Sequence, residues 1–208
     1  MPRSNRAHNL VNGNICCELH FQLQKRSCEI YSNDIRLKVT AAGLYTYPDV
    51  LVVCEEPRFE DDSFDILLNP TALFEVLSPG TEAYDRGAKF GFYRQLDSMQ
   101  EYTLVSQDLM RVEHYLRHNE QWILAEFGSP DDVVRLTSID CELPLREIYA
   151  KIEFPPNDAP HQASVPLQPS FFLKTWILKI LNFPFSINPS PPLLPPPSRQ
   201  MRTSFTGH

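Results

Sequence analysis

Two carboxylates and a lysine stand where a metal-assisted hydrolase could use them. Asp49 opens the apolar, β-branched run 50–53, and Glu75 lies inside a second apolar run, 72–77. Lys89 follows in a segment with helical periodicity. Carboxylates on two neighbouring strands can bind a hard divalent cation, and a nearby lysine can stabilise negative charge. These three residues therefore predict hydrolysis assisted by a metal ion.

Each of the three residues also has a purely structural interpretation. Asp49 follows Pro48 and could only shape the start of a strand. Lys89 could form an exposed helical pair with Asp85, which lies one turn earlier. Glu75 is harder to explain in this way, because a carboxylate among apolar neighbours is costly to bury without a partner. The residue pattern therefore favours a functional role most strongly for Glu75.

The periodicity of apolar residues predicts the elements that would carry this site. It indicates a helix over 8–25 capped by Asn5 or Asn9, strands over 28–31, 35–39, 45–54 and 71–77, a helix over 81–96, strands over 102–105, 111–116, 122–127 and 133–136, and a helix over 144–149. The acidic segment 55–69 is expected to be an exposed loop. Strand 71–77, helix 81–96 and strand 102–105 make a β-α-β crossover. The fold class is therefore α/β (α+β), with a mixed central sheet and additional antiparallel strands.

The composition changes near residue 154, and this change sets the predicted domain boundary. Residues 155–197 contain 12 of the 19 prolines, including two oligoproline runs that favour polyproline structure. We predict one domain over 1–154 and a proline-rich, disordered extension over 155–208. No run reaches the roughly 18 apolar residues that a membrane span needs, so no membrane partner is expected.

Charge, cysteines and histidines restrict the possible binding partners, cellular location and metal ligands. A formal net charge of −7 opposes attraction to nucleic acid, so DNA binding would need a local basic patch or bridging metal ions. The five cysteines show no C-x-x-C spacing, and most lie among apolar residues. We interpret them all as reduced thiols of a cytoplasmic protein. The six histidines show no ligand spacing, and His8 is interpreted as structural or solvent-exposed.

Three segments carry a resemblance to a known family. They are Tyr45-x-Tyr47-Pro48-Asp49-Val50, Phe74-Glu75-Val76-Leu77-Ser78-Pro79-x-Thr81-Glu82-x-Tyr84-Asp85-Arg86-x-x-Lys89-Phe90, and Tyr93-Arg94. Together they resemble the Uma2 family of restriction-endonuclease-like proteins, in the PD-(D/E)xK nuclease superfamily. The resemblance covers roughly residues 8–150. It implies a restriction-endonuclease-like mixed central sheet flanked by helices, DNA as the substrate, and Mg²⁺ or Mn²⁺ as the metal.

The resemblance also implies a set of metal ligands. Asp49 matches the aspartate of the Pro-Asp element, and Glu75 matches the acid of the second strand. Both are expected to bind the metal, together with the backbone carbonyl of Val76. Asp34 matches a recurrent family aspartate and is expected as an accessory ligand, with a turn residue as its structural alternative.

The catalytic lysine departs from the superfamily pattern. It normally lies two residues after the second acid, where this chain has Leu77, and Lys89 on the following helix is expected to replace it. The expected function is a metal-dependent endonuclease that hydrolyses DNA phosphodiester bonds by metal-activated water, with Asp49, Glu75 and Lys89 as catalytic residues. The alternative is a catalytically silent nuclease fold that acts as a binding or regulatory module associated with mobile elements. A homodimer is a further expectation.

Overall fold

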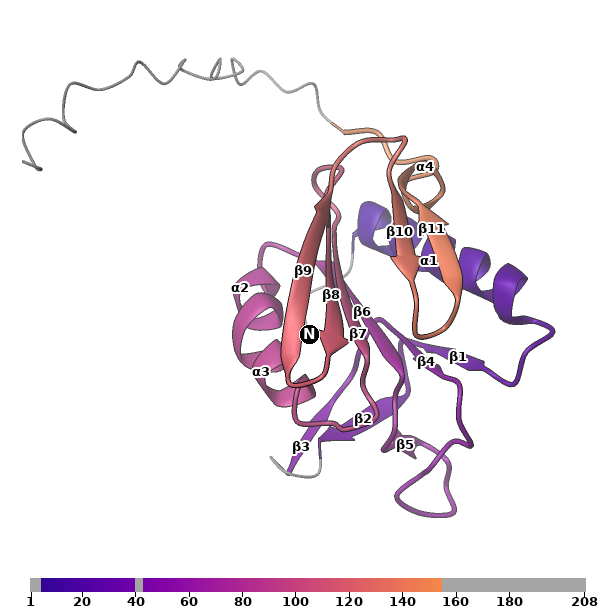
Figure 1. Cartoon of the computed structure of the whole chain (residues 1–208). Coiled ribbons are helices and arrows are strands. Elements are labelled where there is room, and N and C mark those ends of the chain that lie inside the picture. Colours follow the sequence, from indigo (N-terminus) through magenta and orange to yellow (C-terminus); the bar gives the residue numbers. More distant parts are fainter. Residues whose placement is uncertain (1–4, 40–42, 155–208) are drawn as a thin grey trace, which may run out of the picture. The chain divides into compact units, whose positions relative to one another are not determined.

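A mixed six-stranded sheet forms the centre of the computed structural model, which describes residues 5–39 and 43–154 (Figure 1). In spatial order its strands are β1 (Glu29–Ser32), β4 (Val50–Val53), β6 (Ala72–Leu77), β7 (Glu101–Ser106), β8 (Val112–His118) and β9 (Gln121–Phe127). Strands β6 and β7 run parallel, and all other neighbours are antiparallel. The predicted mixed sheet with a β-α-β crossover is therefore confirmed. The predicted proline-rich extension over 155–208 lies outside the described residues.

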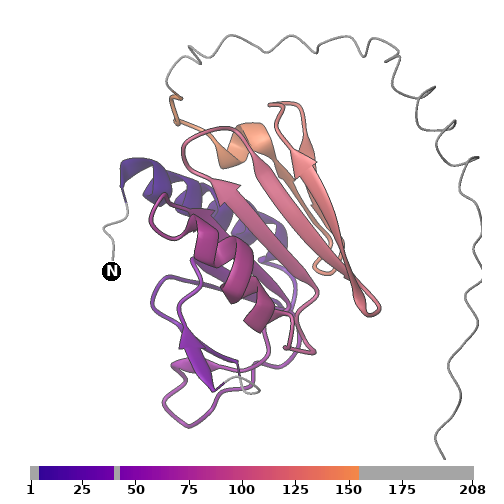
Figure 2. The same ribbon diagram turned by 90° about the vertical axis from the view of Figure 1, so that its left-hand side faces the viewer.

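Helices cover both faces of this sheet (Figures 1 and 2). One face packs against α1 (Arg6–Leu23), whose N-cap is Asn5, as its side chain accepts a hydrogen bond from the backbone N–H of His8 at 2.9 Å. The other face packs against a π-helical turn (Asp85–Lys89) and α3 (Phe90–Tyr93). The short helix α2 (Glu82–Tyr84), which has no buried residues, precedes the turn. Because both faces are covered, all residues of β4 and β6 are buried.

Two smaller sheets complete the described part of the chain. One contains β3 (Leu44–Thr46), β2 (Arg36–Val39) and β5 (Ile66–Leu67), and the other contains β10 (Val133–Leu136) and β11 (Cys141–Pro144), followed by α4 (Leu145–Ile148). The prediction of one continuous strand over 45–54 was wrong, because this segment is divided between β3 and β4, in two different sheets. Pro48 lies at the break, where its missing N–H cannot contribute to a strand ladder. Asp49 is thereby left just before β4, outside either ladder.

The prediction that 55–69 is an exposed loop was also incomplete. Ile66 and Leu67 form β5, pair in parallel with β2, and are 6% and 0% exposed. Two residues are too few to show a strand period, so the acidic residues before them dominated the prediction.

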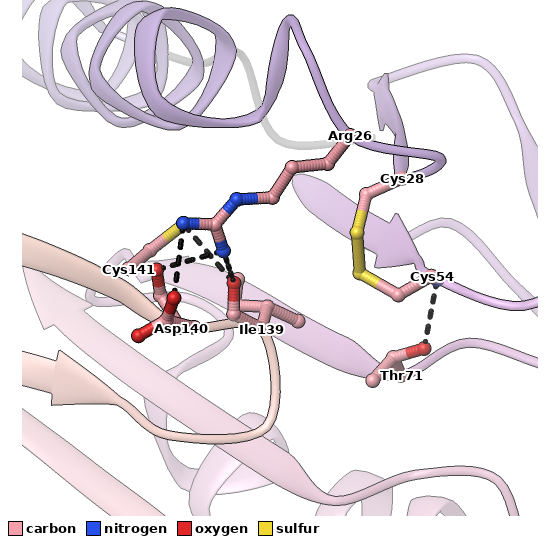
Figure 3. The surroundings of a disulfide bond; sticks show 7 residues. All are labelled: Arg26, Cys28, Cys54, Thr71, Ile139, Asp140 and Cys141. Atoms are coloured by element: carbon pink, nitrogen blue, oxygen red, sulfur yellow. Dashed lines mark hydrogen bonds and ion pairs between the residues drawn. A yellow bond between two sulfur atoms is a disulfide. The ribbon is translucent and has the colours of Figure 1, made fainter.

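A disulfide joins Cys28 and Cys54, contrary to the prediction that all cysteines are reduced (Figure 3). Cys28 directly precedes β1 and Cys54 directly follows β4, and the antiparallel pairing of Glu29 with Val53 brings the two cysteines opposite each other. Such a pair depends on strand register, which the spacing of cysteines does not reveal. Cys16, Cys17 and Cys141 are free thiols.

Reducing the Cys28–Cys54 bond should lower the free energy of unfolding by about 3 kcal/mol, because it joins residues 26 positions apart and restricts the unfolded chain. The melting temperature should fall by about 6–12 °C, as measured by circular dichroism with and without reductant. Cys17→Ser, which alters an exposed free thiol, should melt like wild type in both conditions. A wild-type melting temperature that ignores the reductant would contradict this role for the disulfide.

Candidate active site

A pocket of about 710 Å³ opens at the end of the central sheet, where β6 ends and β4 begins. All of the residues expected to bind metal or to act in catalysis line it: Asp34, Asp49, Glu75, Val76 and Lys89. They come from the loop before β2, the connection before β4, strand β6 and the π-helical turn. Segments that are far apart in sequence therefore meet in one pocket.

The side chain of Glu75 lies on the face of the sheet that α3 covers, where two side chains hold its carboxylate. Its side chain is 3% exposed, and its Oε1 lies 2.7 Å from Nζ of Lys89. The hydroxyl of Tyr93 donates a hydrogen bond to the same oxygen at 3.0 Å. Alternation along β6 explains the direction, because Leu73 and Leu77 belong to the same apolar cluster as Tyr93. The carboxylate thus has the partners that its burial requires.

Lys89 is buried between two carboxylates. Its Nζ also lies 3.1 Å from Oδ1 of Asp85, whose side chain is 4% exposed. The alternative of an exposed helical pair between Lys89 and Asp85 is therefore wrong. The turn that carries both residues lies against the sheet, and the hydroxyl of Tyr102 on β7 donates a hydrogen bond to the carbonyl oxygen of Asp85 at 3.0 Å.

Asp49 lies at the mouth of this buried network, with a side chain that is 20% exposed. Its Oδ2 accepts a hydrogen bond from the backbone N–H of Val76 at 2.8 Å, and its Oδ1 lies 3.4 Å from Nε2 of His8. The N–H and C=O of one strand residue leave the strand on the same side. The carbonyl of Val76 therefore points to the side of β6 on which Asp49 lies.

The pocket carries more negative than positive charge. Burial raises the pKa of Glu75 to about 8; Lys89 opposes this shift, whereas Asp49 and Asp85 add to it. Burial by itself would lower the pKa of Lys89, but Glu75 and Asp85 outweigh it, so the pKa rises and the ammonium is retained. Three carboxyl groups and one buried ammonium thus line the same pocket, and an added cation would relieve the repulsion between the carboxylates.

The oxygen donors fit a hard divalent cation that keeps several waters. Among residues 5–39 and 43–154, no group of three or more His, Cys, Asp or Glu side chains is arranged to hold a metal ion. Mg²⁺, however, is usually bound by only one or two carboxylates and completes its octahedron with water and substrate. Asp49, Glu75 and the carbonyl of Val76 are oxygen donors of this kind from residues that line one pocket, and its excess negative charge favours such an ion.

Two pocket residues were missed by sequence reasoning. His8 was interpreted as structural or exposed, yet it contacts Asp49 from the first turn of α1. Gln107 follows β7 and lines the same pocket. The predicted crossover was the one signal for Gln107, because parallel pairing of β6 and β7 brings their carboxyl ends together. No periodicity in the sequence shows that α1 begins beside Asp49.

The mixed sheet with helices on both faces defines a restriction-endonuclease-like α+β fold. A family model described as "Uma2: Putative restriction endonuclease" matches residues 1–146. The chain therefore belongs to the Uma2 family, which confirms the resemblance.

Two relatives come from the cyanobacterium Synechocystis. Uncharacterized protein sll1609 is 41% identical over 120 residues, which cover 57% of this chain and 68% of the relative. Uncharacterized protein slr1290 is 30% identical over 155 residues, which cover 74% of this chain and 80% of the relative. In the described part of the chain, no helix is both long and apolar enough to cross a membrane.

Proposed function

We propose that this protein is an endonuclease that hydrolyses DNA phosphodiester bonds with the help of Mg²⁺ or Mn²⁺. The observation that carries the proposal is the contact of Glu75 with Lys89 at 2.7 Å in the pocket that also contains Asp49. Membership of a family described as restriction endonucleases supports a nuclease and DNA as its substrate. The metal, the residues in their roles and the activity itself are our proposal.

Asp49, Glu75 and the backbone carbonyl of Val76 would hold the metal ion, with Asp34 as an accessory ligand. When bound, such an ion lowers the pKa of a water molecule and polarises a phosphoryl oxygen. The hydrogen bond from Val76 to Asp49 orients that carboxylate. Tyr93 orients Glu75 in the same way, and burial raises the pKa of its hydroxyl well above the ordinary value, so it remains a neutral donor.

Lys89 would neutralise the charge that develops on the phosphate during hydrolysis. Its ammonium is fixed by Glu75 and Asp85, so little reorganisation is needed when the charge appears. The net charge of −7 means that DNA is not attracted by the average field of the protein. We therefore expect DNA affinity to depend on the metal ion.

The cytoplasm remains our proposed location, because it contains the proposed DNA substrate. Cellular thiols keep most cysteines reduced there. The Cys28–Cys54 disulfide would then form only in protein exposed to oxidising conditions.

The proposal is tested by incubating supercoiled plasmid and single-stranded DNA with the protein in Mg²⁺, Mn²⁺ or EDTA. We expect cleavage with either metal, none in EDTA, and a loss of about 10²–10³-fold in Asp49→Asn, which removes a charge at the ion. Asp65→Asn is the matched control, because Asp65 forms a half-exposed pair with Arg36 away from the pocket.

Two results would contradict the proposal. Equal cleavage by wild type and Asp49→Asn would indicate a contaminant or a different site. DNA binding without cleavage under any metal condition would favour the alternative of a silent binding module.

A further inference from the structure

Tyr47 is an aromatic residue of the pocket whose ring is left open to solvent. It lines the pocket that contains Asp49 and is 45% exposed. Within the described part of the chain, its ring stacks on no other aromatic ring and its hydroxyl makes no hydrogen bond. Tyr45 is similarly exposed at 44%, but its hydroxyl bonds to Glu60 and Lys38 lies over its ring. Contacts within the protein therefore explain the position of the Tyr45 ring, but not that of the Tyr47 ring.

The backbone of Tyr47 is fixed by its neighbours on both sides. The hydroxyl of Thr46, the preceding residue, lies 3.2 Å from the hydroxyl of Tyr93, which in turn donates a hydrogen bond to Glu75. Asp49, which also lines the pocket, follows two residues after Tyr47. Successive side chains of an extended chain point to opposite sides, and Thr46 is buried, so Tyr47 is directed to the open side. Tyr47 is thereby tied to both carboxylates that we propose as metal ligands.

The volume of the pocket and the nature of the ring indicate what the open face binds. A volume of about 710 Å³ lies within the range of about 300–1,000 Å³ that is typical of small-molecule sites. The octahedral water shell of Mg²⁺ fills only about 180 Å³ of it, at roughly 30 Å³ per water. A tyrosine ring is neutral and flat, which suits the face of a nucleobase better than a charged phosphate. In duplex DNA the neighbouring base pairs cover that face, so only an unpaired or extruded base can stack on the ring.

We propose that Tyr47 is a stacking platform for one unpaired nucleobase and that single-stranded DNA is the preferred substrate. The proposal rests on the proposed nuclease function and names the form of DNA that the same site takes. A base held on this ring has its sugar and phosphate in the pocket that contains Asp49 and Lys89. Stacking also adds affinity that the net charge of −7 does not supply. Because every base has an aromatic face, this contact should give little sequence preference.

Binding of matched chains with and without bases tests the proposal without an assay of cleavage. The probes are a fluorescein-labelled single-stranded oligo(dT) and an abasic deoxyribose-phosphate chain of equal length, both with phosphorothioate linkages that resist hydrolysis. Fluorescence anisotropy in Mn²⁺ should show that the wild type binds oligo(dT) about tenfold more tightly than the abasic chain. Tyr47→Ala should lose this preference. Tyr47→Phe should keep it, because the ring and not the hydroxyl stacks on the base.

Tyr84→Ala is the matched control. Tyr84 is also 45% exposed, but it lies on α2 and does not line the pocket, so this variant should keep the tenfold preference. The melting temperature of Tyr47→Ala should equal that of the wild type, because the ring has no stacking or hydrogen-bonding partner to lose within the described part of the chain. Wild type and Tyr47→Ala should bind an oligo(dT)–oligo(dA) duplex alike, and the wild type should bind it more weakly than oligo(dT).

Several outcomes would overturn the stacking role of Tyr47. Wild type that binds the two single chains equally, or binds neither, has no base site. Retention of the preference by Tyr47→Ala, or its loss in Tyr47→Phe, would exclude the ring as the stacking surface. A lower melting temperature for Tyr47→Ala would mean that the ring packs on the protein. Duplex bound as tightly as oligo(dT) would exclude the preference for single strands. Wild type that prefers oligo(dT) and cuts no DNA would support the base site and count against the nuclease alone.

Discussion

Replacing Lys89 with methionine should lower the free energy of unfolding by about 3–5 kcal/mol at neutral pH, because the buried carboxylate of Asp85 loses its counter-charge. The side chains of Glu75 and Asp85 are 3% and 4% exposed, so water cannot replace the ammonium. This loss is a large fraction of the total stability of a typical domain, which is roughly 5–15 kcal/mol. Cleavage should fall by about 10²-fold or more, since the charge near the phosphate is lost. Urea unfolding in EDTA measures the first effect and plasmid cleavage the second.

Lys38→Met is the matched control for this substitution. Lys38 pairs with Glu60, and the two side chains are 22% and 28% exposed. Removing such an exposed pair should change the free energy of unfolding far less than the Lys89 substitution does, because solvent screens both charges. Adding Asp85→Asn to Lys89→Met should recover part of the lost stability, because it removes the stranded charge. If the Lys89 and Lys38 variants unfold alike, Lys89 is not the counter-charge of this pocket.

Raising the pH from 6 to 9 in EDTA should destabilise the wild type by an amount on the order of 2 kcal/mol. Burial raises the pKa of Glu75 from 4.5 to about 8, so the folded protein holds this proton more tightly than the unfolded chain. Stability from this group is therefore present at acidic pH and is lost as the pH rises from about 4.5 to about 8. The pKa of Lys89 is raised, so its own contribution is lost only above its ordinary value of 10.5.

Glu75→Gln isolates this pH effect. The variant should lose less free energy of unfolding between pH 6 and 9 than the wild type does. Because both proteins contain the same histidines, subtracting the two losses cancels the contribution of the histidines. Adding Mg²⁺ at pH 8 should stabilise the wild type, by about 2.7 kcal/mol at a hundred times its dissociation constant. The variant should gain much less, because it lacks one of the proposed ligands. Identical pH and Mg²⁺ responses in the two proteins would remove Glu75 from the proposed metal site.

The sheet was largely predictable from local pattern. Residues 72–77 are apolar at nearly every position, as expected for a strand covered on both faces, and the helix after it implied a parallel return to β7. A functional role for Glu75 was also predictable from this pattern, because Glu75 is the one carboxylate within that apolar run. Its contact with Lys89 followed from the family resemblance, since strand and helix periodicity do not show how a helix is rotated against a sheet.

The rest of the pocket depends on contacts that one sequence does not display. Asp85 was considered only as the partner of Lys89 in an exposed pair, because their spacing is the same in an exposed pair and in a buried one. Tyr93 packs in the apolar cluster next to α3, and its hydroxyl also donates a hydrogen bond to Glu75, which no pattern in the sequence shows. His8 contacts Asp49 because of the way α1 packs on the sheet, and Cys28 lies next to Cys54 because of the strand register. Those arrangements are set by the whole core.

The break at Pro48 divides the pocket into two parts that tolerate change differently. Glu75 is built into the buried network of β6, so its loss to an apolar residue would remove one of the two carboxylates that pair with buried Lys89. Asp49 lies outside any ladder and holds its position through Val76 and His8. Substitution at Asp49 should therefore cost little folding energy. An inactive descendant of this protein would most easily arise by losing Asp49 while keeping Glu75 and Lys89. A lineage that retains all three has therefore kept Asp49, although its loss would cost the least stability.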